Sequence, residues 1–185
     1  MVQTLYVHYP ELGDDVSTFQ DNLSFDYNNR MYLSTVEKID PSKYFKVNLL
    51  GGSVSFDIDL SKSGCGCITA LYAVGMPAAE NSFSPFQYCD ASKTGGYYCP
   101  EFDLMHANRH AYRTNAHRCD APSATGLYSS CDTIGQCAVD ILQNEGDYDY
   151  GPSYIYTINT QKPFSVNTVF YEKDGEFTGY TTTFV

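Results

Sequence analysis

Alternating polarity over Val54–Leu60 constrains the fold more than any other feature of the sequence. Apolar residues occupy every second position of this stretch, and serine or aspartate stands between them. Because successive side chains of a strand point to opposite faces, the pattern predicts a strand with one buried and one solvated face. No stretch of a dozen residues shows the period of an amphipathic helix. The sequence therefore predicts an all-β protein.

Further strands are expected where short apolar and aromatic runs lie between turn residues. Asn28 and Asn29 tolerate positive φ and predict a hairpin turn between strands at 23–27 and 31–36, and Gly51-Gly52 predicts another turn. The other expected strands are 44–49, 68–76 (apolar enough to be buried on both faces), 99–108, 153–158, 166–172 and 177–185, with loops at 77–98 and 109–153. Together these elements predict an antiparallel β-sandwich with long loops.

Length and charge narrow the possible functions. The 185 residues suit one domain spanning 1–185, in which 1–15 form a poorly defined N-terminal segment. The formal net charge of −11 argues against a nucleic-acid partner, and no apolar run is long enough to argue for a membrane. The first residues do not form a signal peptide, so we expect a removed leader or a piece of a longer chain.

Seven cysteines indicate the compartment. They show no zinc-ribbon spacing, so disulfides formed in an oxidising environment are the better interpretation, and their odd number leaves at least one thiol outside an internal bond. The triplet that begins at Asn22 is a glycosylation acceptor and agrees with secretion. The chain also has 17 Tyr and no Trp, which is the strongest side chain for stacking on sugar rings.

The stretch Cys99–Asn108 carries the candidate chemistry. On a strand, Glu101 and Asp103 point to the same face, and His106 reaches that face only if a bulge inserts one extra residue. Retaining glycoside hydrolysis needs two carboxyl groups about 5–5.5 Å apart, one as nucleophile and one as acid/base. Glu101 and Asp103 satisfy the first half of this requirement, but they are equally compatible with two solvated acids on an exposed strand.

The stretch reads Cys-Pro-Glu-Phe-Asp-Leu-Met-His-Ala-Asn and resembles the catalytic strand of the family 7 glycoside hydrolases, Cys-x-Glu-x-Asp-x-x-Glu-Ala-Asn, at every fixed position but one. The similarity keeps its order from about Val16 to the C-terminus. Other similar stretches are 56–60, 70–72, 88–90, 117–119, the pair Cys131 and Cys137, and 150–153. The resemblance implies a concanavalin-like jelly roll acting on β-1,4-glucans such as cellulose.

The resemblance also implies roles for individual residues. Glu101 corresponds to the nucleophile and Asp103 to the acid that assists it, while His117 and Asn108 correspond to substrate-binding positions. His106 stands where the family has its acid/base glutamate. Because an imidazole differs from a carboxylic acid in shape, reach and charge, we expect weak hydrolysis or none.

The family's disulfides imply the bonds Cys89–Cys99 and Cys119–Cys131 in this chain. The partners of Cys65 and Cys137 fall in a C-terminal half that this sequence lacks, and Cys67 has no counterpart. Because family members are longer, we expect a fragment, a shortened relative, or a subunit completed by other chains through these thiols or through exposed sheet edges.

Three functions therefore stay open from the sequence. The first is an extracellular protein that contacts β-1,4-glucan without efficient hydrolysis, and the second is an active retaining β-1,4-glucanase with Glu101 as nucleophile. The third is a structural assembly protein built on a glycosidase scaffold. No cofactor or metal is expected, because His106, His110, His117 and Cys119 lack metal-ligand spacing.

Overall fold

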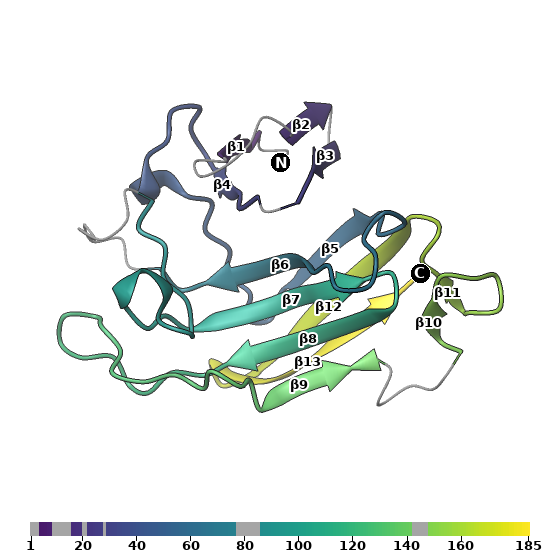
Figure 1. Cartoon of the computed structure of the whole chain (residues 1–185). Helices are drawn as coiled ribbons and strands as arrows, with labels where there is room; N and C mark the ends of the chain where they lie inside the picture. The colour runs from purple at the N-terminus through teal and green to yellow at the C-terminus, as the bar shows by residue number, and fades with distance from the viewer. Residues whose placement is uncertain (1–3, 9–15, 20–21, 28, 77–85, 142–147) are drawn as a thin grey trace. The chain divides into compact units, whose positions relative to one another are not determined.

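The computed structural model describes residues 4–8, 16–19, 22–27, 29–76, 86–141 and 148–185 (Figure 1). The chain divides into two compact units. One contains Met1–Val47 with Pro77–Tyr88, and the other contains Asn48–Met76 with Cys89–Val185. The expectation of one domain over 1–185 stays a prediction, and the candidate site lies wholly in the second unit.

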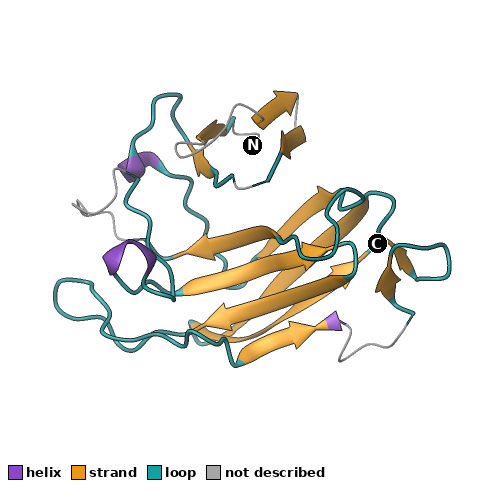
Figure 2. Cartoon of the chain, viewed as in Figure 1, coloured by secondary structure: helices purple, strands orange, loops and turns teal. Residues whose placement is uncertain are grey.

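The second unit is an antiparallel β-sandwich, as the sequence predicted (Figures 1 and 2). One sheet has the strand order β13-β12-β5, with β5 Ser53–Ile58, β12 Phe164–Lys173 and β13 Glu176–Phe184. The other has the order β6-β7-β8-β9, with β6 Thr69–Val74, β7 Glu101–Asn108, β8 Ala111–His117 and β9 Cys137–Asp140. The strands expected around 54–60, 68–76, 99–108, 166–172 and 177–185 are confirmed.

The core lies between these two sheets. Its buried members are Leu60, Met105, Ala107, Tyr112, Ile141, Tyr150, Phe164 and Val166. Aromatic rings dominate the packing: the Tyr112 and Phe184 rings lie 4.8 Å apart, and the Phe102 ring lies 5.0 Å from that of Phe170. Each fully buried large apolar side chain contributes about 1.5–3 kcal/mol, so the sandwich is held mainly by apolar burial.

Two turns follow from local residue chemistry. Gly51 has φ +68° in the turn that precedes β5, as its glycine predicted. The β12–β13 hairpin turns at Asp174 and Gly175, both with positive φ (55° and 83°). Two consecutive positive φ angles suit the right-handed twist of a hairpin, and aspartate and glycine tolerate them.

The first unit corrects the hairpin predicted across Asn28-Asn29. Instead, β3 Asn22–Phe25 pairs with β2 Val16–Phe19, and β4 Tyr32–Ser34 pairs with β1 Tyr6–His8. Alternating polarity identifies a strand but not its partner, which is why the predicted pairing was wrong. Most of the poorly defined segment 1–15 lies outside the described residues.

Other predicted elements are also wrong. Instead of a strand at 44–49, Asp40 caps a 3₁₀ turn, η1 Pro41–Lys43, and only Tyr44 forms an isolated bridge, with Ser34. Part of the expected loop 109–153 instead forms β8 and β9. The prediction failed because the polar residues of these strands cover the solvated face of a sheet and so resemble a loop. Instead of a strand at 153–158, turns separate the short parallel strands β10 Tyr150–Gly151 and β11 Ile158–Asn159.

The remaining loop prediction holds in part. Residues 77–85 lie outside the described part of the chain, and 86–98 form turns, bridges and a second 3₁₀ turn, η2 Thr94–Gly96. Every residue of β6 is half-buried rather than buried on both faces as expected.

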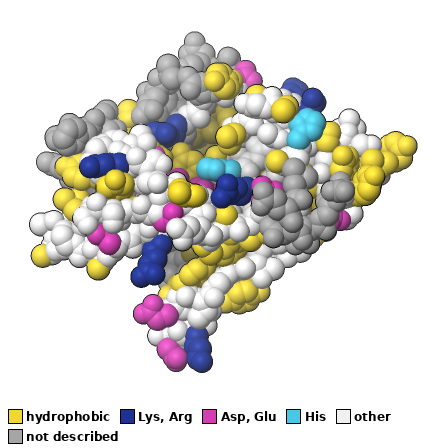
Figure 3. Space-filling view, turned by 60° about the horizontal axis from the view of Figure 1, so that its bottom comes forward, with side chains coloured by type: hydrophobic (Ala, Val, Ile, Leu, Met, Phe, Trp, Pro, Cys, Tyr) yellow, Lys and Arg dark blue, Asp and Glu magenta, His cyan; other side chains and the backbone are white. Residues whose placement is uncertain are grey.

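Large hydrophobic side chains remain exposed in several places, and Figure 3 shows some of them between polar groups on one face. Within the described residues, no helix combines the length and the apolar character needed to cross a bilayer.

Candidate active site

A β-bulge in β7 brings the candidate residues to one face. Asp103 pairs with Asn115 and His106 with Arg113, so three steps along β7 match two along β8. The register to β6 shifts at the same place, which leaves Leu104 as the inserted residue. The bulge that the sequence required for His106 is therefore present. We call the side of this sheet that faces away from β5, β12 and β13 the outer face.

The bulge also keeps the core continuous. Before it, Phe102 points inward and contacts the rings of Phe170 and Tyr180. After it, Met105 and Ala107 belong to the core. Glu101, Asp103 and His106 consequently share the outer face, although they are two and three residues apart.

A buried hydrogen bond satisfies the inserted residue. The Tyr112 hydroxyl donates to the Leu104 carbonyl oxygen at 2.9 Å. Because a buried backbone carbonyl without a partner costs about 1–3 kcal/mol, this bond stabilises the bulge and thereby the site geometry. Tyr112 was not recognised from the sequence, where it reads as an ordinary core aromatic.

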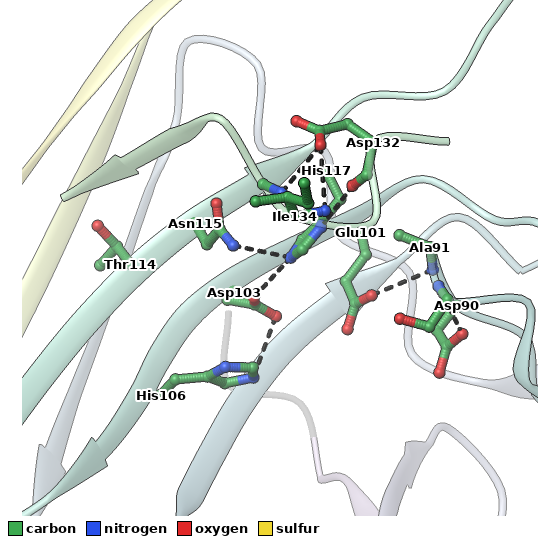
Figure 4. Close-up of polar contacts among 12 residues, drawn as sticks. Asp90, Ala91, Glu101, Asp103, His106, Thr114, Asn115, His117, Asp132 and Ile134 are labelled. Atoms are coloured by element: carbon green, nitrogen blue, oxygen red, sulfur yellow. Dashed lines mark hydrogen bonds and ion pairs between the residues drawn. The ribbon is translucent and has the colours of Figure 1, made fainter. Parts of the chain in front are cut away.

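Asp103 lies between two histidines (Figure 4). Its side chain is fully buried, with Oδ2 3.1 Å from His117 Nε2 and Oδ1 3.3 Å from His106 Nε2. The Oδ1 contact is close enough for an ion pair, but it does not have hydrogen-bond geometry. At this distance the two side chains interact electrostatically when His106 is protonated and Asp103 is ionised.

The surroundings of His117 fix its tautomer. Its Nδ1 lies 2.7 Å from the backbone oxygen of Asp132, which can only accept, so Nδ1 carries a proton. The other nitrogen, Nε2, faces both Asp103 Oδ2 and the Asn115 amide nitrogen, which is 2.9 Å away. Neutral His117 accepts from Asn115, and protonated His117 donates to Asp103.

Asn115 is held by a close neighbour. Gly135 has φ +71°, and a Cβ at this position would collide with the Asn115 amide. Asn115 Oδ1 is buried and has no hydrogen-bond partner among the described residues. Neither residue was predicted from the sequence, because their contact joins β8 to a loop twenty residues further along the chain.

Glu101 pairs directly with His117 across β7 and β8. Its Oε2 accepts from the Ala91 backbone N–H at 3.2 Å. Burial raises the pKa of Glu101 above its ordinary 4.5, with smaller contributions from the negative charges of Asp103 and Asp90, and the Ala91 bond opposes the shift. Burial therefore favours the neutral form of Glu101 more than in an exposed glutamate.

His106 stands where the resemblance predicts a glutamate. Its side chain is 38% exposed and meets the Tyr72 ring edge-on, with 6.4 Å between the ring centres. Burial lowers the pKa of His106 below its ordinary 6.5, and the Asp103 charge only partly opposes this. His106 therefore favours the neutral form at neutral pH.

The other candidate residues lie apart from this group. Asn108 is at the far end of β7, where its Nδ2 donates to the Cys67 carbonyl and its Oδ1 accepts from the His110 and Ala111 backbone N–H groups. These bonds give Asn108 a role in the β7–β8 turn, and its contact with substrate stays a prediction. Asn22 is exposed at the start of β3, and its glycosylation also stays a prediction.

Both disulfides implied by the resemblance, Cys89–Cys99 and Cys119–Cys131, are confirmed. The Cys89–Cys99 bond links the residue before Asp90 to the segment that leads into β7. It therefore fixes the ends of the loop that contains Ala91. Cys65, Cys67 and Cys137 are free and exposed.

An apolar pocket of about 550 Å³ adjoins the site. Glu101, His117 and Asp132 contribute its polar edge, while apolar side chains form most of its wall. The apolar residues lining it are Leu49, Leu50, Phe102, Ala116, Phe170 and Phe177. It opens between the sheets at the end of β7 where Glu101 begins the strand.

Comparison with known proteins identifies the fold that carries this site. A probable endo-β-1,4-glucanase, celB, of Neosartorya fischeri is 32% identical over 177 residues, which cover 81% of this chain and 42% of the relative. The native Humicola insolens endocellulase EGI superposes with a TM-score of 0.70 at 26% identity, over 85% of this chain and 46% of that one. The chain has a family 7 glycoside hydrolase-like fold.

A family 7 cellobiohydrolase of Daphnia pulex supports the same fold. It superposes with a TM-score of 0.75 over 92% of this chain and 52% of its own, at 21% identity. No protein-family model matches the chain. This family 7-like chain spans about half the length of the solved structures and about two fifths of the curated relative.

Proposed function

We propose that this family 7-like chain is an extracellular protein that binds β-1,4-glucan on the outer face of β6–β9 and hydrolyses it weakly or not at all. The observation that carries the proposal is His106, which lies beside Glu101 and Asp103 and stands where the resemblance predicts the acid/base glutamate. The likeness to endo-β-1,4-glucanases supports the ligand class. The two disulfides support an oxidising compartment.

The loss of hydrolysis follows from proton supply. A retaining enzyme must protonate the leaving oxygen while its nucleophile is ionised. Because the pKa of His106 is lowered, its imidazole is mostly deprotonated at neutral pH. When His106 is protonated, the Asp103 carboxylate 3.3 Å away stabilises that proton and opposes its transfer to a substrate.

Binding does not need the missing acid. Glu101 and Arg113 present an acceptor and a donor of the kinds that bind sugar hydroxyls, and Tyr72 lies beside His106 as an aromatic surface. Aromatic and polar groups that converge on one rigid sheet are typical of sugar sites. The absence of tryptophan from the chain suits weak binding.

Calorimetry with cellotetraose tests binding directly. We expect a measurable heat of binding and a Kd in the millimolar to high micromolar range. This Kd corresponds to a binding free energy of about −4 to −6 kcal/mol. Tyr72→Ala weakens it at least about threefold, whereas Tyr171→Ala, an exposed tyrosine on the other sheet, leaves it unchanged. An absence of heat with folded protein at millimolar ligand contradicts glucan binding.

A fluorogenic cellobioside assay tests the lost acid. His106→Glu should raise turnover by about 10²–10⁴-fold, the usual contribution of a positioned general acid. His110→Glu, on the exposed β7–β8 turn, is the matched control and should change nothing. If the parent already hydrolyses at a rate that His106→Glu does not raise, the impaired-enzyme proposal is wrong.

Residual retaining hydrolysis is a second candidate, favoured by the retained Glu101. It requires ionised Glu101 and protonated His106. Because burial raises the first pKa from 4.5 and lowers the second from 6.5, the window between them is narrow. Any hydrolysis should therefore peak sharply between pH 4.5 and 6.5 and disappear in Glu101→Gln.

Assembly through cysteines is a third candidate, favoured by the exposed thiols of Cys65, Cys67 and Cys137. Non-reducing electrophoresis combined with sedimentation distinguishes it. Disulfide-linked oligomers that vanish when all three are changed to serine support assembly, whereas a monomer under oxidising conditions contradicts it.

A further inference from the structure

We propose that Glu101, Asp103 and His117 bind a divalent metal ion of the zinc class. One carboxylate oxygen from each acid and one imidazole nitrogen lie within 4.8 Å of one another. No metal was predicted from the sequence, because these ligands come from two strands and have no spacing signature. The proposal does not depend on glucan binding, and either one can fail without the other.

The sheet holds the three side chains in place. Glu101 and His117 are direct cross-strand partners, and Asp103 lies two residues beyond Glu101 on the same face. Hydrogen bonds from β6 and β8 to β7 fix all three backbones, so little conformational entropy is lost when a ligand binds. Sites built on strands are more precise than sites built on loops.

His117 is prepared as a ligand. Because Nδ1–H donates to the Asp132 carbonyl, the lone pair of neutral His117 is on Nε2, which is 3.1 Å from Asp103 Oδ2. A histidine that binds metal commonly donates its other N–H to a carbonyl or carboxylate in this way. A lone pair that faces an ionised oxygen is repulsive unless a proton or a cation lies between them.

Asp103 supplies an independent indication. Its side chain is fully buried, and Oδ1 has no hydrogen-bond partner in the described part of the chain. A buried carboxylate needs compensation by a positive charge or by hydrogen bonds. A cation on Oδ2 provides that compensation, and His106, 3.3 Å from Oδ1, then orients the carboxylate from its other side.

The donor set selects the ion. Two carboxylate oxygens and one imidazole nitrogen suit Zn²⁺, which binds such ligands at about 2.0–2.2 Å and often keeps a water in a fourth position. Ligands at that distance in a tetrahedron lie about 3.3 Å apart, close to the 3.1 Å between His117 Nε2 and Asp103 Oδ2. Mg²⁺ and Ca²⁺ prefer all-oxygen sites and fit less well.

Metal binding requires a local rearrangement at Asn115. Its Nδ2 donates to His117 Nε2 at 2.9 Å, and a metal on Nε2 replaces that bond. Rotation of the amide turns Oδ1, which has no hydrogen-bond partner among the residues that the structure describes, toward the ion. After this rotation Asn115 Oδ1 faces the cation and is no longer a buried acceptor without a partner.

Titration of Zn²⁺ into the full chain tests the proposal, with Co²⁺ as a spectroscopic substitute. The protein is first treated with a chelator, and its three free thiols are alkylated, because exposed cysteines bind zinc themselves. We expect one Zn²⁺ to bind per chain. Bound Co²⁺ should show the visible d–d absorption of an ion with a low coordination number.

Matched variants identify the ligands. The isosteric changes Asp103→Asn and Glu101→Gln should each weaken Zn²⁺ binding more than about 100-fold, and His106→Gln about 10–100-fold, as expected for a group behind the ligands. His110→Gln should have no effect. Absence of binding, loss of binding on alkylation alone, or binding unaffected by Glu101→Gln in folded protein would each overturn the site.

Discussion

The two faces of β7 show how one strand meets opposite requirements. Inward, Phe102, Met105 and Ala107 contact apolar neighbours and stabilise the sandwich by burial. Outward, Glu101 and Asp103 are held close together, and burial works against the charge of Glu101. The inserted Leu104 separates the two patterns. The inward face therefore stabilises the fold, whereas the outward face positions the chemical groups although burial disfavours the charge of Glu101.

The largest expected effect lies on the inward face. Met105→Ala should lower the free energy of unfolding by about 2–5 kcal/mol, because Met105 is 2% exposed and its truncation leaves a cavity. Urea unfolding measures the change, with Ile68→Ala as control, since Ile68 is 74% exposed and its truncation should stay within about 0.5 kcal/mol. Equal effects of the two variants would contradict the core described for β7.

The bulge itself is the next test of the comparison. Tyr112→Phe removes the hydroxyl that bonds to the Leu104 carbonyl and should cost about 1–3 kcal/mol by denaturant unfolding. Tyr171→Phe removes an exposed hydroxyl bonded to Thr181 and should cost at most about 0.5 kcal/mol. If Tyr112→Phe also leaves the chemical shift of His106 unchanged, the hydroxyl does not support the site.

Substitutions at two glycines distinguish the effect of backbone strain from the effect of a collision with Asn115 on the outward face. Gly135→Ala and Gly126→Ala both place a Cβ at positive φ (71° and 79°), which costs about 1–2 kcal/mol in each. Only the first also collides with Asn115, whereas nothing lies near the second. Thermal unfolding should therefore show a larger loss for Gly135→Ala, together with a change in the His117 resonance. Equal losses would remove Gly135 from the account of the site.

The smallest effect concerns the charge on Glu101. Its folded pKa is raised above 4.5, so the contribution of Glu101 to stability is present below pH 4.5 and is lost as the pH rises through the folded pKa. Glu101→Gln should therefore raise Tm at neutral pH by about 1–2 °C, a small value because solvent screens a half-exposed group. Below pH 4.5 the difference should vanish, whereas exposed Glu176→Gln should show neither effect.

Sequence patterns succeeded where a residue's environment depends on its immediate neighbours. Alternation over Val54–Leu60 predicted β5, and Gly51-Gly52 predicted the turn that precedes it. They failed for β8, whose outward residues Arg113, Asn115 and His117 read as loop because they are polar. These side chains cover the solvated face of a central strand, and a polar outer face carries no sign of the sheet beneath it.

The sequence alone determined the fold class, and its resemblance to the family 7 glycoside hydrolases implied the two disulfides and a histidine where that family has its acid/base glutamate. The fold class depends on alternation, which is a local property, whereas the disulfides and the role of position 106 came from the resemblance. Only the tertiary structure decided that a bulge aligns Glu101, Asp103 and His106, and that Asp103 lies buried between two histidines. Proton positions and metal ligation depend on distances between strands, and the register of a sheet sets those distances.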